Sequence, residues 1–133
     1  MDHAPGDEVE TTEVAPGVHL AATVVGERMS VQSVYVEPGA SVPRHSHPHE
    51  QTGYLAAGTL TFLVGAEDAE DTDEAADVEV NGEAVSDEEV AVHAGDSYVI
   101  PGGQPHAAVN NGEVPVEGVD VFSPPRENPN WQE

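Results

Sequence analysis

The chain contains no cysteine and no lysine, and its only cationic residues are Arg28, Arg44 and Arg126. The absence of cysteine excludes disulfide bonds and thiolate metal ligands. These three arginines are outnumbered by 26 aspartate and glutamate residues, which give a formal net charge of -23 at pH 7. Because a field of this sign repels nucleic acid and anionic lipid, we expect neither nucleic acid nor a membrane as a partner.

Long apolar runs are also missing. No stretch approaches the roughly 18 apolar residues of a membrane-spanning helix, and residues 1–13 lack the basic and apolar regions of a secretion signal. We therefore expect a cytoplasmic protein. Acidic residues occur along most of the chain rather than in one tail. This distribution favours a halophilic protein, in which counterions screen the self-repulsion of the chain.

A length of 133 residues suits a single domain with one core. We predict a flexible, acidic N-terminal segment at residues 1–13, a single barrel at residues 14–126 and a tail at residues 127–133. The low-complexity run AEDAEDTDEAAD, at residues 66–77, lacks the glycine of a calcium-binding loop. We interpret it as an exposed acidic loop inserted into the barrel.

Short runs rich in β-branched residues, with Gly or Pro near their ends, predict strands rather than helices. In residues 29–39 the apolar side of the alternation holds Gln32, Val34 and Val36, which we place toward the core. Weak helical periodicity and many turn signals favour a closed all-β barrel or jelly roll. The predicted strands lie at residues 19–25, 29–39, 59–65, 88–96, 97–103 and 114–122, with a hairpin around Asn81-Gly82 at residues 77–85.

Histidines occupy alternate positions in the middle of the chain, at His45, His47 and His49, and Gln51 keeps the same parity. In an extended strand such side chains share one face, so His45 and His47 could present two imidazoles to one metal ion. A divalent ion needs further ligands, and His106 is a downstream candidate. His49 follows a proline, and both roles remain open for it: a ligand, or a residue that packs beside the site.

These residues resemble the two sequence motifs of the cupin superfamily. Residues 39–58, GASVPRHSHPHEQTGYLAAG, follow the first motif, with Gln51 where that motif has Glu. Residues 95–110, GDSYVIPGGQPHAAVN, keep every spacing of the second motif. The resemblance implies a cupin double-stranded β-helix, which is a jelly-roll barrel. It also implies that the ligands of one divalent metal ion are His45, His47, Gln51 and His106.

The metal cannot be chosen from the ligand types alone, because three imidazoles and an amide suit Ni, Mn, Zn or Fe. The neutral amide of Gln51 donates less charge than a carboxylate, which leaves the bound ion more electrophilic. A more electrophilic ion polarises oxygen-containing substrates more strongly.

The run DVFSPPR, at residues 120–126, resembles the tail of small single-domain cupins that ketonise 4,5-unsaturated uronates from pectin and alginate. That resemblance implies that Asp120, Phe122 and Arg126 are active-site residues. It implies a metal-dependent enzyme that converts a cyclic 4,5-unsaturated monouronate to its linear keto form by ring opening and tautomerisation. Asp120 and Phe122 share strand parity, so both can point inward. Arg44 has the opposite parity to His45, and we expect it to point outward.

Plainer roles exist for the same residues. Arg126 could form a surface ion pair, Phe122 could be part of the core, and Asp120 could cap a strand end. Two other functions remain open: a non-catalytic, metal-dependent cupin that binds a small sugar or acid, and a quercetinase-like metal dioxygenase. Resemblance to small cupins also implies a homodimer.

Overall fold

The computed structural model describes residues 1–65 and 88–126. Within these ranges the chain forms ten strands and one short 3-10 helix, η1 (Gly6–Glu8), and no α-helix. The acidic run at residues 66–77, the predicted hairpin at residues 77–85 and the tail at residues 127–133 lie outside the described residues. The strands are β1 (Thr12–Ala15), β2 (Val18–Val25), β3 (Ser30–Val36), β4 (Ser41–His45), β5 (Glu50–Ala57), β6 (Thr59–Val64), β7 (Glu88–His93), β8 (Ser97–Ile100), β9 (His106–Val109) and β10 (Val116–Ser123).

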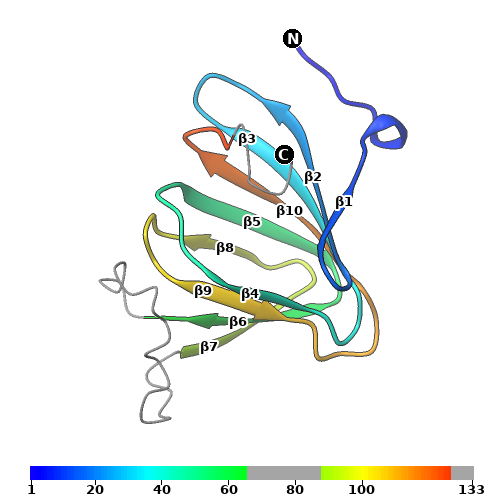
Figure 1. Ribbon diagram of the computed structural model, residues 1–133, viewed down its shortest axis with the longest axis vertical. Helices are drawn as coiled ribbons and strands as arrows, with labels where there is room; N and C mark the ends of the chain where they lie inside the picture. Colours follow the sequence, from blue (N-terminus) through cyan, green and yellow to red (C-terminus); the bar gives the residue numbers. More distant parts are fainter. Residues whose placement is uncertain (66–87, 127–133) are drawn as a thin grey trace.

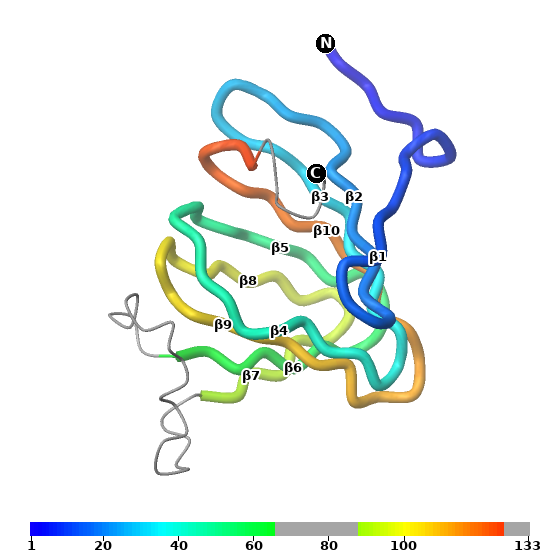
Figure 2. Tube along the Cα trace, viewed as in Figure 1, coloured from blue at the N-terminus to red at the C-terminus, as the bar shows by residue number. Residues whose placement is uncertain are grey.

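The strands form two sheets that face each other, as Figures 1 and 2 show. One sheet has six strands in the order β1-β2-β3-β10-β5-β8, and the other has four in the order β4-β9-β6-β7. Strand neighbours within both sheets run antiparallel. The predicted all-β architecture is confirmed. β1 begins at Thr12, so the six-stranded sheet extends two residues further toward the N-terminus than the predicted boundary at Val14.

Alternation along the strands decides which side chains enter the space between the sheets. On β3, Gln32 is 6% exposed and Val36 is fully buried, whereas Tyr35 between them is 37% exposed. This confirms the predicted inward face of that strand. On β10, Val116, Asp120 and Phe122 are all buried, which confirms that the last two share an inward face.

The apolar core lies between the sheets, away from the strand ends that carry the histidines. Its most completely buried members include Val18, Val36, Leu55 and Val116. A cavity of about 240 Å³ extends beside this core toward the histidines. The interior is therefore partly hollow, with space for a small molecule.

Gly58 makes the tight connection between β5 and β6. Its φ of +84° is a backbone conformation that other residues rarely adopt. A Cβ atom at this position would lie 2.6 Å from the carbonyl oxygen of Pro115. The last glycine of the first sequence motif is therefore required by both the turn and the packing around it.

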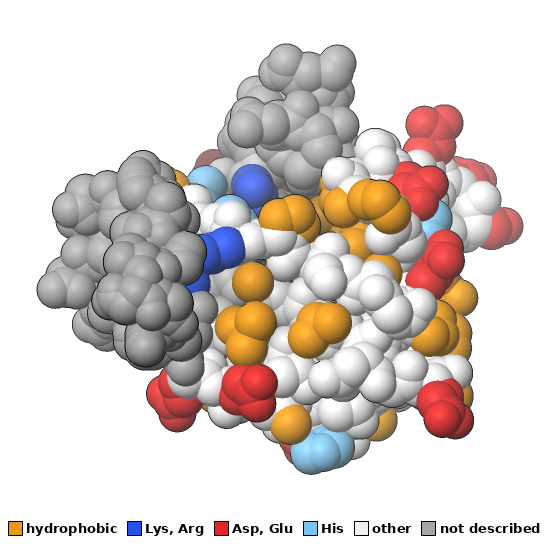
Figure 3. Space-filling model, turned by 60° about the horizontal axis from the view of Figure 1, so that its bottom comes forward, with side chains coloured by type: hydrophobic (Ala, Val, Ile, Leu, Met, Phe, Trp, Pro, Cys, Tyr) orange, Lys and Arg blue, Asp and Glu red, His pale blue; other side chains and the backbone are white. Residues whose placement is uncertain are grey.

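The surface shows how the charges are distributed. On the face in Figure 3, acidic side chains lie mostly toward the margins, and arginine side chains lie close to histidines. Among the described residues, no helix has the length and apolar character needed to cross a membrane.

Candidate metal centre

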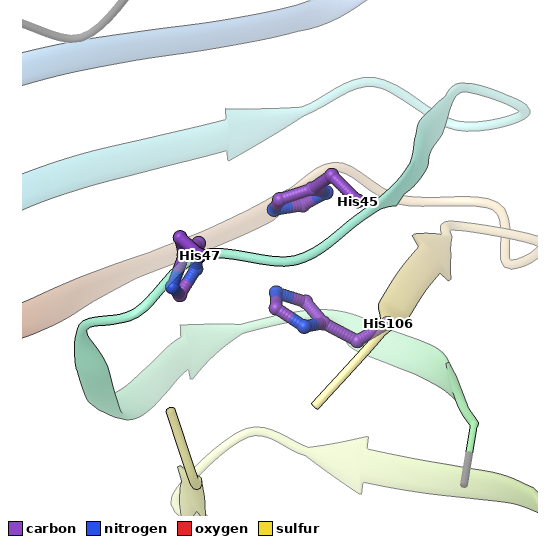
Figure 4. A group of neighbouring side chains, drawn as sticks. All are labelled: His45, His47 and His106. Carbon is purple, nitrogen blue, oxygen red and sulfur yellow. The ribbon is translucent and has the colours of Figure 1, made fainter. Parts of the chain in front are cut away.

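Three histidines converge at one end of the barrel interior. His45 is the last residue of β4, His106 is the first residue of β9, and the two lie directly opposite each other in the antiparallel pair. His47 lies two residues beyond β4, in the segment that leads into β5. Figure 4 shows the three rings turned toward a common centre. One nitrogen from each ring lies within 4.8 Å of the other two, so the three residues could hold one metal ion.

The backbone sets the protonation pattern of each ring. The Nδ1 atom of His45 lies 2.9 Å from the Pro43 carbonyl oxygen, and that of His106 lies 2.8 Å from the Gln104 carbonyl oxygen. The Nδ1 atom of His47 lies 3.2 Å from the carbonyl oxygen of His49. Because a carbonyl only accepts hydrogen bonds, Nδ1 carries the proton in each neutral ring. All three Nε2 atoms then hold a free lone pair.

The Nε2 atom of His106 is buried and has no hydrogen-bond partner among the described residues. A buried nitrogen lone pair without a partner is costly, and coordination of a cation would satisfy it. The donor set, the matching tautomers and this atom together fit a divalent metal ion. The same backbone contacts orient the ligands, as hydrogen bonds to the second imidazole nitrogen do in known metal sites.

Gln51, near the start of β5, lies beside this cluster. Its Oε1 atom is 3.1 Å from Nε2 of His47, and its side chain also donates a hydrogen bond to Asp120. The second bond directs the amide nitrogen toward Asp120 and the amide oxygen toward His47. Two lone-pair-bearing atoms then face each other, an arrangement that a cation between them would relieve. The predicted role of Gln51 as the fourth ligand is consistent with this placement.

The three imidazoles are held in the neutral form that a metal requires. Burial lowers the pKa of His47 to about 4 and that of His106 to about 3, and neighbouring imidazoles add to the effect. Burial also lowers the pKa of His45. These side chains therefore stay uncharged at neutral pH and need not lose protons to bind a cation.

Asp120 is a buried carboxyl group on β10 that borders the same cavity. Burial raises its pKa to about 6, while hydrogen bonds from Tyr98, Gln51 and Gln32 act in the opposite direction. The hydroxyl of Tyr98 donates to Oδ1 of Asp120 over 2.5 Å. Gly53 makes room for this pair, because a Cβ there would lie 2.2 Å from the Tyr98 ring.

Arg126 and Phe122 complete one side of the site. The Arg126 guanidinium carbon lies 5.1 Å from the centre of the Phe122 ring, in cation–π geometry. Burial lowers the pKa of Arg126, and nearby Asp120 opposes that shift. The cavity is bordered by three of the candidate metal ligands, His45, Gln51 and His106. The three predicted catalytic residues, Asp120, Phe122 and Arg126, also border it.

The structure differs from the sequence-based expectation at Arg44 and in the path of the chain to His47. Arg44, which we expected to point outward, borders the cavity. The β4–β9 register shifts between Val42 and His45, so simple parity fails there. His47 shares the site with His45 although β4 ends before it, so a bend in the segment after the strand brings it in. His49 lies outside the three-histidine cluster.

Sequence reasoning missed Tyr98 and Gln32, which both donate hydrogen bonds to Asp120. Gln32 carried a signal, because it is a polar residue on an otherwise apolar strand face. Tyr98 carried none that distinguishes it from an ordinary core aromatic, since its partner lies 22 residues away.

A small antiparallel barrel with histidines gathered at one end of its interior defines a class of metal-binding β proteins. A sequence profile described as Cupin domain matches residues 32–72 and 76–122. The chain therefore belongs to the cupin family.

Solved structures agree on the fold. KdgF from Halomonas sp. is 23% identical with a TM-score of 0.72, over 96% of this chain and 98% of that one. An RmlC-like cupin from Shewanella frigidimarina is 21% identical with a TM-score of 0.71, over 96% of each chain. The polyketide cyclase RemF from Streptomyces resistomycificus is 20% identical with a TM-score of 0.66, over 92% of this chain and 79% of that one. No curated protein matches the sequence significantly. At these identities, the similarity establishes the fold alone.

Proposed function

We propose that this cupin is a divalent-metal-dependent enzyme that opens the ring of a cyclic 4,5-unsaturated monouronate and tautomerises the product to its linear keto form. The observation that carries the proposal is one cavity bordered by metal-ligand candidates, a buried carboxyl group and an arginine. The DVFSPPR run that supplies Asp120, Phe122 and Arg126 adds support. The likeness to KdgF from Halomonas sp. supports the fold that this chemistry needs.

In this proposal His45, His47, His106 and Gln51 hold the metal ion, which supplies Lewis acidity toward the substrate oxygens when it is bound. Arg126 binds the substrate carboxylate, because a guanidinium forms two parallel hydrogen bonds with such a group. The chain has only three cations among 26 acidic residues, so a cation on the cavity wall is a strong local attraction for an anionic substrate.

Asp120 moves the protons. Its pKa of about 6 lies close to neutral pH, where one group can both accept and release a proton. Asp120 takes the proton of the anomeric hydroxyl, the ring C–O bond breaks, and Asp120 returns that proton to the released ring oxygen, which leaves an aldehyde and an enol. The enol loses its O–H proton and gains one at carbon, so that a ketone forms. The atoms of the substrate are conserved, and no oxidant or reductant is needed.

The direct test is to mix metal-loaded protein with a 4,5-unsaturated monouronate. We expect the ultraviolet absorbance of the conjugated double bond to fall, to fall much more slowly after chelation, and to recover its rate when metal is restored. Stable absorbance with metal-loaded protein would reject the proposal. Tight binding without any reaction would support the non-catalytic binding function instead.

The apolar part of the cavity wall supports a second candidate function. Beyond the polar end its wall is apolar, with Val34, Val36, Leu55, Leu60 and Phe62. A quercetinase-like dioxygenase needs such a wall for an apolar substrate, together with a redox-active metal. Oxygen uptake in the presence of a flavonol, without reaction of the uronate, would favour this candidate.

A further inference from the structure

His49 does not border the cavity, yet it contacts both halves of the candidate site. It is the last residue before β5, and its ring lies edge-to-face with His47 at 5.6 Å and with Phe122 at 6.0 Å between ring centres. Phe122 in turn lies beneath the Arg126 guanidinium. His49 therefore stands between the metal-binding segment and the chain end that carries the arginine.

The backbone and the side chain of His49 form hydrogen bonds with different partners. Its backbone carbonyl accepts the hydrogen bond from Nδ1 of His47 and so helps to orient a metal-ligand candidate. Its side chain is hydrogen-bonded to the backbone carbonyl of Pro125. The Nδ1 atom of His49 has no partner among the described residues, so the donor in the bond to Pro125 is Nε2.

The segment that carries Arg126 needs anchors, because it leaves the sheet when β10 ends at Ser123. Two further contacts hold it: the Ser123 hydroxyl donates to the Arg28 carbonyl, and the Arg126 backbone N–H donates to the Ser30 hydroxyl, each over 2.9 Å. The bond from His49 fixes the peptide carbonyl immediately before Arg126. The direction in which the guanidinium leaves the backbone depends on that peptide.

We propose that His49 is a positioning residue that holds the Pro125–Arg126 peptide against the metal-binding segment and so aims the Arg126 guanidinium into the cavity. This inference rests on the proposed function for the role of Arg126 as the carboxylate-binding group. It assigns the third histidine of the HSHPH run to substrate positioning rather than to metal coordination.

Trypsin offers a readout that does not depend on any activity. The chain has no lysine, so trypsin can cut only after Arg28, Arg44 and Arg126. Loss of one hydrogen bond raises the population of the detached segment about fivefold, and cleavage of a transiently open segment follows that population. We expect His49→Ala to accelerate release of residues 127–133 about fivefold, while cleavage after Arg28 keeps its rate.

Matched variants separate anchoring from general stability. His49→Gln places an amide N–H close to the position of Nε2, and we expect it to restore most of the protection. His93→Ala removes an exposed histidine on β7 and should leave cleavage after Arg126 unchanged. Unchanged release from His49→Ala, or equal acceleration after Arg28 and Arg126, would overturn the proposal.

Metal analysis and kinetics complete the test. We expect the His49→Ala protein to keep the wild-type metal content and to show a raised KM for the monouronate with a smaller change in kcat. Loss of the metal would instead make His49 part of the metal site and contradict the inference. If the wild-type protein does not turn over the monouronate, the proposed function fails, while the protease result still decides whether His49 anchors the segment.

Discussion

The two ends of the barrel interior are built from the same strands but have opposite chemistry. On β5 the inward side chains change from Gln51 to Leu55, and on β10 they change from Asp120 to Val116. The apolar end excludes water and stabilises the fold, whereas the polar end holds neutral imidazoles and a carboxyl group whose pKa is raised. The packed apolar part of each strand thus holds in place the site residues that lie a few positions away on the same strand.

The largest expected effect is at the polar end. Asp120→Asn keeps the shape of the side chain but removes the group that moves protons, so we expect kcat to fall about 100- to 10,000-fold. Metal content and folding should persist. Glu117→Gln, which changes an exposed acid on the same strand, is the matched control and should retain activity. Full activity of the Asp120 variant would remove its catalytic assignment.

Removal of one imidazole tests the metal centre itself. We expect His106→Ala to weaken divalent-metal affinity by at least about 100-fold, since one of a small set of ligands is lost. Competition with a metal-sensitive chelator dye would measure the change. His93→Ala should bind metal like the wild-type protein, and an equal loss in both variants would indicate non-specific binding to surface groups.

A substitution at the apolar end should lower the stability of the fold, whereas substitutions at the polar end should lower activity or metal affinity. Leu55 is 1% exposed, so Leu55→Ala should lower the free energy of unfolding by about 2–5 kcal/mol. Val99 is 57% exposed, and Val99→Ala should change it by less than about 0.5 kcal/mol. Chemical denaturation of both proteins at one salt concentration provides the comparison. Similar losses of stability would argue against a core at that end.

The pH dependence of metal affinity gives the smallest predicted effect. Protons compete with a metal only below the pKa of each ligand, and burial lowers those of His47 and His106 to about 4 and 3. Burial also lowers the pKa of His45, so we expect affinity to begin to fall at a lower pH than exposed histidines would cause, and to fall steeply below about pH 4. Titrations at several pH values would check this. A decline that starts near pH 6.5 would mean that the imidazoles titrate as exposed histidines do.

Much of the fold could be predicted because β-branched residues mark many of its strands, including β3 and β6. The strands β5 (EQTGYLAA) and β9 (HAAV) escaped the strand prediction because small and polar residues dominate them. Their extended form depends on neighbours, with β5 lying between β10 and β8 and β9 between β4 and β6. Pairing of that kind cannot be read from local propensity.

The candidate site likewise has a part that the sequence predicted and a part that it could not predict. The motif spacing predicted that His45, His47 and His106 would converge, and the structure confirms it. The hydrogen bonds from Tyr98 and Gln32 to Asp120 depend on which strands pair within the six-stranded sheet, where β3 and β5 flank β10 and β8 lies next to β5. The contact between His49 and Pro125 likewise joins two distant segments. Such contacts join residues that are far apart in sequence and have no spacing signature.

Anomalous scattering from crystals of the metal-loaded protein, recorded at the absorption edge of the metal, tests the central claim most directly. We predict one peak per chain, about 2.1 Å from the Nε2 atoms of His45, His47 and His106, with the amide oxygen of Gln51 also coordinated. A peak bound through Nδ1 atoms, or one outside the barrel, would contradict the account.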